Sequence, residues 1–220
     1  MSGEAKLDIL SRIYRAGAKP PSGRAHPPAA AAHPHAELVE QFAAYTAEYR
    51  ARVHGCTEAE LPGTIVSLLA GERAILPPGL PQMWVQSGLH TLDSGQSHHE
   101  LSAFGAVVTG CAVAIAETGT VVLDHGAGQG RRALTLIPDH HICVVCESQV
   151  VGSLPQGVAQ LGAAVRAGRP LTMISGPSAT SDIELSRVEG VHGPRRLDIV
   201  LLLSTGQLAF KLLLALEKGS

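Results

Sequence analysis

One stretch of the sequence gathers several chemically useful side chains. The apolar run 170–174 predicts a buried strand, and it ends in Ser-Gly-Pro-Ser at 175–178. Gly and Pro break regular structure there, and Thr180 or Ser181 is typical of a helix N-cap. A small-residue loop between a strand and a helix leaves backbone N–H groups free to meet an anion. An ordinary capped turn is the alternative. The candidate ligand contacts of this loop are Ser175, Gly176, Ser178 and Thr180.

Acidic residues and a histidine follow this loop. Asp182 and Glu184 are expected in the first turn of the helix, where two carboxylates disfavour a simple phosphate site. His192 stands between Gly190 and Gly193, which leave room for a ligand, and an imidazole there can donate or accept a proton. Asp182, Glu184 and His192 are therefore candidate catalytic residues. A loop histidine with an internal hydrogen bond is the alternative.

A single carboxylate, Glu117, stands between two apolar, strand-like segments. Burying it unpaired is costly, so it is either exposed or used. Gly119 lets a ligand or another backbone come close, and Thr118 lies between the two. Glu117 is a candidate general base or acyl nucleophile, with Thr118 and Gly119 as candidate binding residues. A tight turn with an exposed glutamate is an equally supported alternative.

A glycine-rich segment, 126–130, precedes Arg131 and Arg132. The order of its glycines does not fit a dinucleotide fingerprint, the following residues 134–137 predict a strand instead of a helix, and the Walker lysine is missing. The two arginines can instead clamp a carboxylate or phosphate. Gln129 and Arg131 are the candidate binding residues of this segment. A glycine hairpin with solvated arginines is the alternative.

The cysteines and the paired histidines predict structural roles. Cys143 and Cys146 lie in a strand-like segment, where residues three apart point to opposite faces. Zinc or an iron–sulfur cluster would need further cysteines at ligand spacing, and Cys56 and Cys111 stand alone. The pair at 140–141 cannot easily share a metal, because adjacent side chains of an extended chain face opposite ways. We expect core thiols and no metal site.

Helices and strands must position these residues. Helices before and after a run of strands indicate a three-layer α/β domain. An amphipathic helix at 7–15 and a Pro/Ala/His-rich linker predict an N-terminal arm over 1–35, which leaves the folded domain over 36–220. We expect helices at 37–53, 57–70, 150–167 and 208–216, one helical turn at 97–101, and strands near 73–76, 106–110, 112–116, 119–124, 132–138, 141–146 and 197–203.

Composition excludes several classes of protein. The formal net charge is only −2, Lys and Arg are scattered and aromatics are few, so there is no nucleic-acid footprint. The N-terminus is charged and does not resemble a signal peptide, and no apolar run is long enough to span a bilayer. We therefore expect a cytoplasmic protein with reduced cysteines.

Four ordered motifs together resemble the lactate utilization protein C family, the stand-alone form of the LUD domain. The resemblance covers about 37–203, and its motifs lie at 116–120, 128–135, 175–184 and 190–194. It implies a fold like the sugar-phosphate isomerase and CoA-transferase superfamily, a Rossmann-like three-layer sandwich with a mixed, mostly parallel sheet. It also implies a role in oxidising L-lactate to pyruvate with iron–sulfur partner proteins. This chain lacks the necessary cysteine clusters, so we expect any iron–sulfur cofactor in the partners and none here.

The resemblance leaves the chain's own activity open. The leading hypothesis is a non-redox component that supplies a small-anion cleft or a docking surface. The Glu-Thr-Gly of 117–119 is similar to the Glu-Asn-Gly of CoA-transferases, in which the carboxylate accepts the acyl group, although Thr118 replaces the Asn. One alternative is therefore a stand-alone acyl- or CoA-handling enzyme that uses Glu117. The other is a non-catalytic interaction module with the 7–15 arm as its hook.

Overall fold

The computed structural model describes residues 7–8, 11–12, 15–16, 34–85, 88, 90–177, 179–180, 188–189 and 193–204. The chain divides into two compact units, Met1–Ala30 and Ala31–Ser220. Within the first unit, residues 7, 8, 11, 12 and 15 are helical, in line with the expected amphipathic helix. The helix expected at 208–216 lies outside the described residues. The fold and the site described below belong to the second unit.

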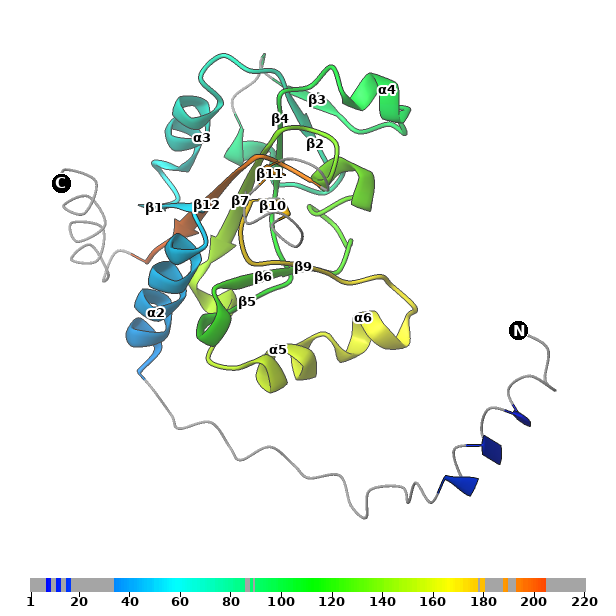
Figure 1. Cartoon of the computed structure of the whole chain (residues 1–220). Helices are drawn as coiled ribbons and strands as arrows, with labels where there is room; N and C mark the ends of the chain where they lie inside the picture. The colour runs from blue at the N-terminus through cyan, green and yellow to red at the C-terminus, as the bar shows by residue number, and fades with distance from the viewer. Residues whose placement is uncertain are drawn as a thin grey trace. The chain divides into compact units, whose positions relative to one another are not determined.

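A six-stranded sheet in which every neighbouring pair is parallel forms the centre of this unit (Figure 1). Its strand order is β1-β12-β7-β4-β2-β3. The strands are β1 (Arg52–Cys56), β2 (Ala74–Leu76), β3 (His90–Leu92), β4 (Ala106–Thr109), β7 (His140–Cys146) and β12 (Arg196–Leu202). β4 is buried along its whole length and β7 nearly so, as a parallel sheet covered on both faces requires.

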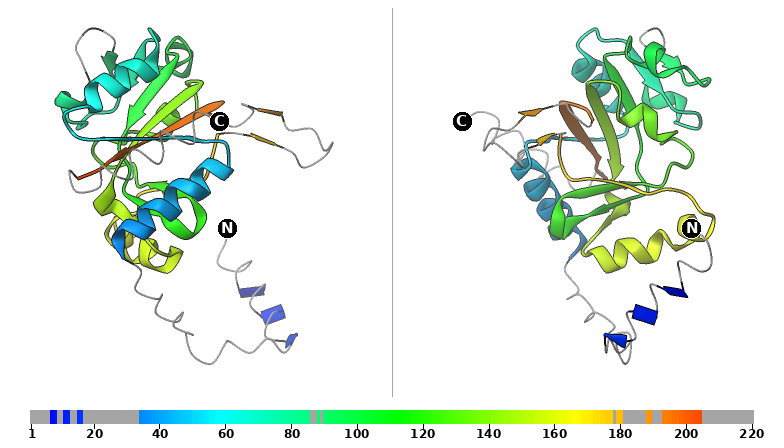
Figure 2. Two further views of the ribbon diagram at one scale, coloured as in Figure 1. Left: turned by 90° about the vertical axis from the view of Figure 1, so that its left-hand side faces the viewer. Right: turned by 45° about the vertical axis from the view of Figure 1, so that its right-hand side comes forward.

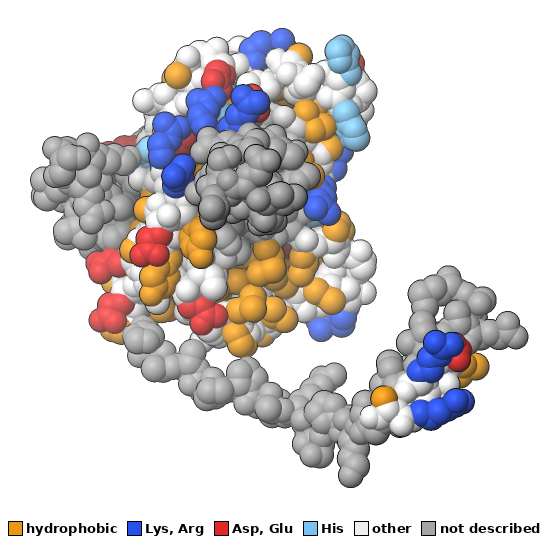
Figure 3. Space-filling view, in the orientation of Figure 1, with side chains coloured by type: hydrophobic (Ala, Val, Ile, Leu, Met, Phe, Trp, Pro, Cys, Tyr) orange, Lys and Arg blue, Asp and Glu red, His pale blue; other side chains and the backbone are white. Residues whose placement is uncertain are grey.

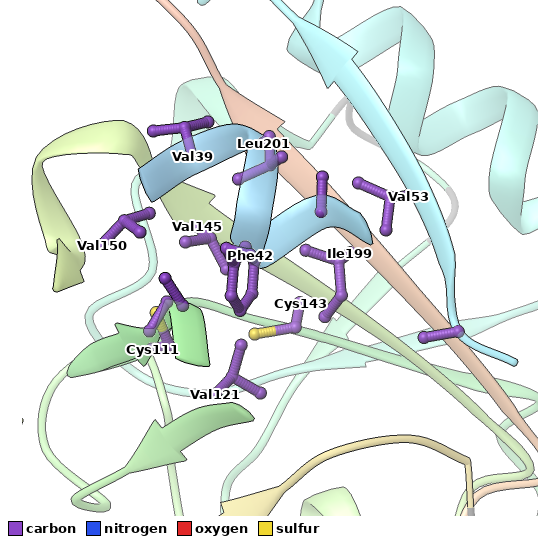
Figure 4. Packing of buried hydrophobic residues seen from close by; sticks show 14 of the residues in the cluster. Val39, Phe42, Val53, Cys111, Val121, Cys143, Val145, Val150, Ile199 and Leu201 are labelled. Atoms are coloured by element: carbon purple, nitrogen blue, oxygen red, sulfur yellow. The ribbon is translucent and has the colours of Figure 1, made fainter. Parts of the chain in front are cut away.

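Successive residues of β7 point to opposite faces of this sheet. On one face, Ile142 and Val144 pack against helix α3 (Leu61–Leu69). On the other, Cys143 and Val145 pack against Phe42 of helix α2 (His35–Glu48), as Figure 4 shows. Both faces of the sheet are thus covered, and the main core lies along β7 and β12.

A second, four-stranded sheet lies on the same side as α2, as Figures 1 and 2 show. Its order is β8-β5-β6-β9, in which β5 pairs with β6 and β6 with β9 antiparallel, whereas β5 and β8 are parallel. The strands are β5 (Val113–Ile115), β6 (Thr120–Leu123), β8 (Val150–Val151) and β9 (Thr172–Ile174). Its outer face packs on Leu161, between helices α5 (Leu154–Gln160) and α6 (Gly162–Arg166). The predicted Rossmann-like α/β sandwich with mostly parallel strand pairing is confirmed: the main sheet is parallel throughout, and antiparallel pairs occur in the second sheet.

Short elements complete the described part of the unit. They include one helical turn, α4 (His98–Leu101), which the sequence predicted. The others are the 3-10 turns η1 (Gln82–Trp84), η2 (Ala116–Thr118), η3 (Arg132–Thr135) and η4 (Glu147–Gln149), and the strands β10 (Ala179–Thr180) and β11 (Val188–Glu189), which pair antiparallel.

Several predicted elements are wrong. The expected strand at 132–138 is η3, because Leu134 is buried against Phe104 and its neighbours instead of joining a sheet. The helix expected from 150 begins only at Leu154, since 150–151 form β8 beside β5. The first long helix ends at Glu48, and 52–56 form β1, which was not predicted.

The segment around the 175–178 loop also differs from expectation. β9 is the edge strand of its sheet and is only partly buried, with Met173 55% exposed, so the predicted buried strand is wrong. Thr180 belongs to β10 and pairs with Val188, so it does not cap a helix. The predicted helix start at 181–184 lies outside the described residues.

Candidate functional site

Two cavities lie close to the predicted site residues. The first, of about 350 Å³, is bordered by the amino ends of β7 and β12, by β9 and by the residues that follow β9. The second, of about 780 Å³, lies where β2 and β3 end, against the glycine-rich segment 126–130. Arg132 lines both cavities, so they share one wall.

The loop after β9 contributes two predicted residues to the first cavity, Ser175 and Gly176. The Ser175 hydroxyl lies 2.8 Å from Thr120 Oγ1, which lies 2.8 Å from Thr118 Oγ1. Any side chain at Gly176 would collide with α2's end, since a Cβ there would lie 2.7 Å from the Tyr49 carbonyl oxygen. The loop is therefore held against both the second sheet and the chain that follows α2.

His141 borders the first cavity, although the sequence singled it out only as half of an unsuitable metal pair. The residue is 1% exposed, and its Nε2 lies 2.8 Å from Thr109 Oγ1. Nδ1 has no hydrogen-bond partner among the described residues. Burial, helped by the charge of His140, lowers the pKa of His141 to about 3. The imidazole is therefore neutral at neutral pH, with one ring nitrogen unsatisfied.

The two adjacent arginines have different surroundings. Arg131 donates from Nε and Nη2 to the Asp93 carboxylate at 3.0 and 2.9 Å, and from Nη2 to the Gln96 carbonyl at 2.5 Å. The hydrogen bonds between them raise the pKa of Arg131 and lower that of Asp93. Arg131 thus ties the glycine-rich segment to the loop after β3. The Arg132 side chain is exposed and makes no hydrogen bond or ion pair with any described residue.

His125 and Thr172 link the two cavities. His125 lines the second, Thr172 lines the first, and Nε2 lies 2.8 Å from the threonine hydroxyl. Nδ1 lies 2.8 Å from the Gly130 carbonyl, which only accepts, so Nδ1 donates this hydrogen bond. The imidazole therefore joins the glycine-rich segment to β9.

Glu117 lines neither cavity. It lies in η2, and its Oε1 accepts a hydrogen bond of 2.6 Å from the Leu154 N–H at the start of α5. Gly119 has a φ of +57°, and a Cβ there would lie 2.5 Å from the Thr46 nitrogen of α2. The close approach expected at Gly119 is thus made by another backbone. These contacts place Glu117 at the start of a helix, whereas Arg131 lines the second cavity.

The other predicted residues are buried or fall outside the description. Gln129 is buried, and its Oε1 accepts a hydrogen bond from the Asp124 N–H at 2.7 Å, which closes the turn after β6. Thr180 is described in its backbone alone. Ser178, Asp182, Glu184 and His192 lie outside the described residues.

A charged cluster on the α3 side of the main sheet was not predicted. Asp198 of β12 is fully buried and accepts hydrogen bonds from Arg52 Nη2 (2.5 Å), His54 Nε2 (2.6 Å) and His140 Nε2 (2.7 Å). Burial by itself raises the pKa of Asp198, but these three donors and the Arg52 charge outweigh burial and hold it well below the usual range. The cluster ties β1, β12 and β7 together; its outer part includes Glu72, which pairs with Arg196 at 2.5 Å.

Comparison with known proteins identifies the family of this chain. The LUD domain matches residues 83–202, which hold most of both cavities. Lactate utilization protein C of Deinococcus radiodurans is 50% identical over 204 residues, which are 91% of this chain and 96% of that protein. The chain belongs to the lactate utilization protein C family of LUD-domain proteins. The resemblance seen in its four motifs is confirmed.

Two further relatives agree with this family. Lactate utilization protein C of Bacillus pumilus is 31% identical over 186 residues, 73% of this chain and 76% of that protein. The crystal structure of a DUF162 family protein from Deinococcus radiodurans has a TM-score of 0.70 and 45% identity, covering 78% of this chain and all of that one. The fold of this family member is thus also that of an experimentally solved relative.

Although Cys111 stands alone in the sequence, it shares a hydrogen bond with Cys143 in the core, and this contact together with burial raises the pKa of Cys111. Cys56, Cys111 and Cys143 are buried and Cys146 is half-buried, all with free thiols. In the part of the chain that the structure describes, no three His, Cys, Asp or Glu side chains are placed to hold a metal ion. A search of the same part finds no helix with the length and apolar character needed to cross a membrane.

Proposed function

We propose that this protein acts in lactate utilization, as a non-redox component of a system that oxidises L-lactate to pyruvate together with iron–sulfur partner proteins. The observation that carries the proposal is the 50% identity to a lactate utilization protein C over nearly the whole of both chains. In this proposal the partners hold the iron–sulfur clusters, and this chain holds none.

The two cavities support an anion-binding contribution from this chain. Arg132 lines both, and no carboxylate of the described residues neutralises it. An unpaired guanidinium beside a cavity attracts anions, and its planar donors match a carboxylate. Lactate and pyruvate both carry one carboxylate.

Growth on L-lactate tests this proposal. In the source organism, or in a lactate-using host whose related gene is deleted and which has no other L-lactate oxidase, loss of this chain should abolish growth on L-lactate. Growth on pyruvate should be unaffected, because the missing step precedes it. Re-introducing the full chain should restore growth on lactate. Undiminished growth of the deletion strain on lactate would contradict the proposal.

A docking role is a second candidate, which an exposed apolar surface favours. Figure 3 shows hydrophobic side chains gathered over α5, α6 and β9. The exposed members are Leu154, Val158, Val165, Leu171 and Met173. Grouped apolar side chains on a surface are typical of protein contact sites. Val158→Lys with Met173→Lys should then reduce co-purification with the iron–sulfur proteins, while Glu40→Lys on α2 should not.

The acyl-transfer alternative gains no support from the position of Glu117. Its carboxylate is hydrogen-bonded to the start of α5 and lines neither cavity. In the lactate proposal, Glu117→Gln should therefore leave growth on lactate intact. A covalent acyl adduct at Glu117 after incubation with acyl-CoA esters would reinstate the enzyme hypothesis.

A further inference from the structure

We propose that the second cavity, between the end of β2 and the glycine-rich segment 126–130, binds an aromatic monocarboxylate. Arg132 would pair with the carboxylate, and the proline and alanine side chains of the cavity would pack against the ring. This ligand is additional to lactate and pyruvate, so its binding does not depend on the proposed function.

The cavity lies at a switch point of the main sheet. β2 and β4 are parallel neighbours. After β2 the chain continues to β3 on one side, whereas after β4 it reaches β7 on the opposite side by way of the second sheet (Figure 1). Connections that leave in opposite directions open a crevice outside the carboxyl ends of the two strands, and ligands of parallel sheets bind in such crevices. Pro78 and Gly79, which line the cavity, come just after β2.

The glycine-rich segment joins the ends of these two strands. The Gly128 N–H donates to the Pro78 carbonyl at 2.9 Å, and the Gly128 carbonyl accepts from the Gly110 N–H, just after β4, at 2.9 Å. A Cβ at Gly130 would lie 2.6 Å from Leu134 Cδ1, so the segment packs closely there too. Main-chain contacts therefore fix this wall of the cavity without a ligand.

His125, in the same wall, has an unusual backbone conformation. Its φ of +55° lies in the left-handed region, which residues with a side chain seldom adopt. Its ring is held from both sides, because Nδ1 donates to the Gly130 carbonyl and Nε2 contacts the Thr172 hydroxyl, each at 2.8 Å. Such conformations persist where the surroundings impose them, and they concentrate at ligand sites. The strain at His125 thus coincides with the cavity.

The charges of the cavity favour a ligand with one negative charge. Arg131 and Asp93 both line it, and they form an ion pair at 2.9 Å. Arg132 makes no hydrogen bond or ion pair with any described residue. Its guanidinium can hold one carboxylate through two parallel hydrogen bonds. A phosphate monoester carries a second negative charge, for which the described lining residues offer no second unpaired arginine.

The size and walls of the cavity favour a ring. Its volume of about 780 Å³ lies in the upper part of the range of ligand pockets and is more than twice that of the first cavity. Pro78, Ala127 and Pro170 give it apolar walls, and the rigid proline rings keep those walls apart. A stiff aromatic ring loses less conformational freedom on binding than a flexible chain of the same size. An aromatic acid therefore fits better than a fatty acid.

Titration calorimetry on the full chain tests the proposal with 2-naphthoate as the probe. The comparison compounds are 2-naphthamide, which has the ring without the charge, acetate, which has the charge without the ring, and AMP, which carries a dianionic phosphate. Naphthoate should bind saturably, and naphthamide and acetate should each bind at least tenfold more weakly, because each lacks one of the two contacts. No saturable binding of naphthoate, equal binding of naphthamide, or tighter binding of AMP would overturn the proposal.

Matched variants assign the contacts. Arg132→Gln should weaken naphthoate binding at least tenfold and leave naphthamide binding unchanged, because only the charged compound uses the guanidinium. Ala127→Trp should weaken the binding of both at least tenfold, because the larger side chain takes up space in the cavity. The controls Arg166→Gln on α6 and Ala159→Trp on α5 replace exposed residues and should change neither.

Circular dichroism confirms that each variant folds. A folded Ala127→Trp protein that binds naphthoate as tightly as the wild type would place the ligand outside this cavity and overturn the proposal. Unchanged naphthoate binding by a folded Arg132→Gln protein would do the same.

The growth assay separates this proposal from the proposed function. If deletion of the chain does not impair growth on lactate, the proposed function fails, and naphthoate binding still supports the aromatic ligand. If naphthoate does not bind but deletion abolishes growth on lactate, the aromatic ligand fails and the proposed function stands.

Discussion

Asp198 is the residue whose replacement should cost most stability. Its buried carboxylate satisfies donors from Arg52, His54 and His140, and removing one member of such a buried cluster leaves the others uncompensated. We expect Asp198→Asn to lower the free energy of unfolding by about 3 kcal/mol in urea titrations at pH 7. The control is Asp139→Asn, because that side chain is 62% exposed and 3.8 Å from Arg195. It should cost less than about 1 kcal/mol.

Acid should weaken this cluster in a defined window. The folded pKa of Asp198 is below its ordinary value of 3.8, so its contribution is complete above pH 3.8 and is lost as the pH falls further. Below pH 4 the free energy of unfolding of the wild type should therefore fall more steeply than that of Asp198→Asn. Parallel curves for the two proteins would show that folding does not lower the pKa of Asp198.

His141 should also make the free energy of unfolding fall as the pH falls, but over a higher pH range than Asp198. In the unfolded chain it takes up a proton near pH 6.5, whereas in the folded protein it resists protonation until about pH 3. Its contribution is complete above 6.5 and is lost as the pH falls toward 3, with a slope of up to about 1.4 kcal/mol per pH unit. His141→Gln should remove that slope from urea-unfolding free energies measured between pH 6.5 and 4. If the slope is the same in His141→Gln and in the wild type, the pH dependence in this range does not come from His141.

At the scale of elements, the contact between α2 and η2 depends on Gly119. Its φ of +57° disfavours a side chain, and its Cβ position 2.5 Å from the Thr46 nitrogen leaves no room for one. Gly168 has a similar φ of +71° but open space around it, which makes it a matched control. Gly168→Ala should cost about 1 kcal/mol from backbone strain, and Gly119→Ala at least about 2 kcal/mol more, because α2 must move. Equal losses of thermal stability would contradict this close packing.

The elements that could be predicted are those whose sequence alone explains their burial. β4 and β7 are continuous apolar runs, as strands covered on both faces must be. β1 could not be found in this way, because its polar Arg52 and His54 pair with Asp198, more than a hundred residues away. The sequence of η3 is apolar enough to resemble a strand. The residues that bury Leu134 are distant in sequence, so local sequence does not reveal that it joins no sheet.

The residues of the candidate site likewise fall into those that local sequence could predict and those that only distant contacts explain. Ser175 and Gly176 were predicted from residue types that end a strand, and they border a cavity. Glu117 was chosen because it interrupts apolar segments, but the start of α5 explains that carboxylate. His141 gave no local signal, since its unsatisfied nitrogen is a product of burial between β4 and the cavity.

At the scale of the whole molecule, the two compact units should be separable. The division falls between Ala30 and Ala31, before α2 begins at His35. Deleting residues 1–30 should therefore leave the urea-unfolding free energy of the remainder within about 0.5 kcal/mol of the full chain. A larger loss would mean that the first unit contributes to the stability of the second.

The order β1-β12-β7 has a consequence for synthesis. β12, almost the last described segment to leave the ribosome, is inserted between β7 and β1, and β12 is the neighbour on which β1 depends. While residues 57–195 are being made, β1 has no strand to pair with, and from residue 147 onward one edge of β7 also lacks its neighbour. Unpaired edges invite association with other chains. The central sheet therefore closes only after β12 has been made, and we expect chaperones to bind a nascent chain that is halted before residue 196.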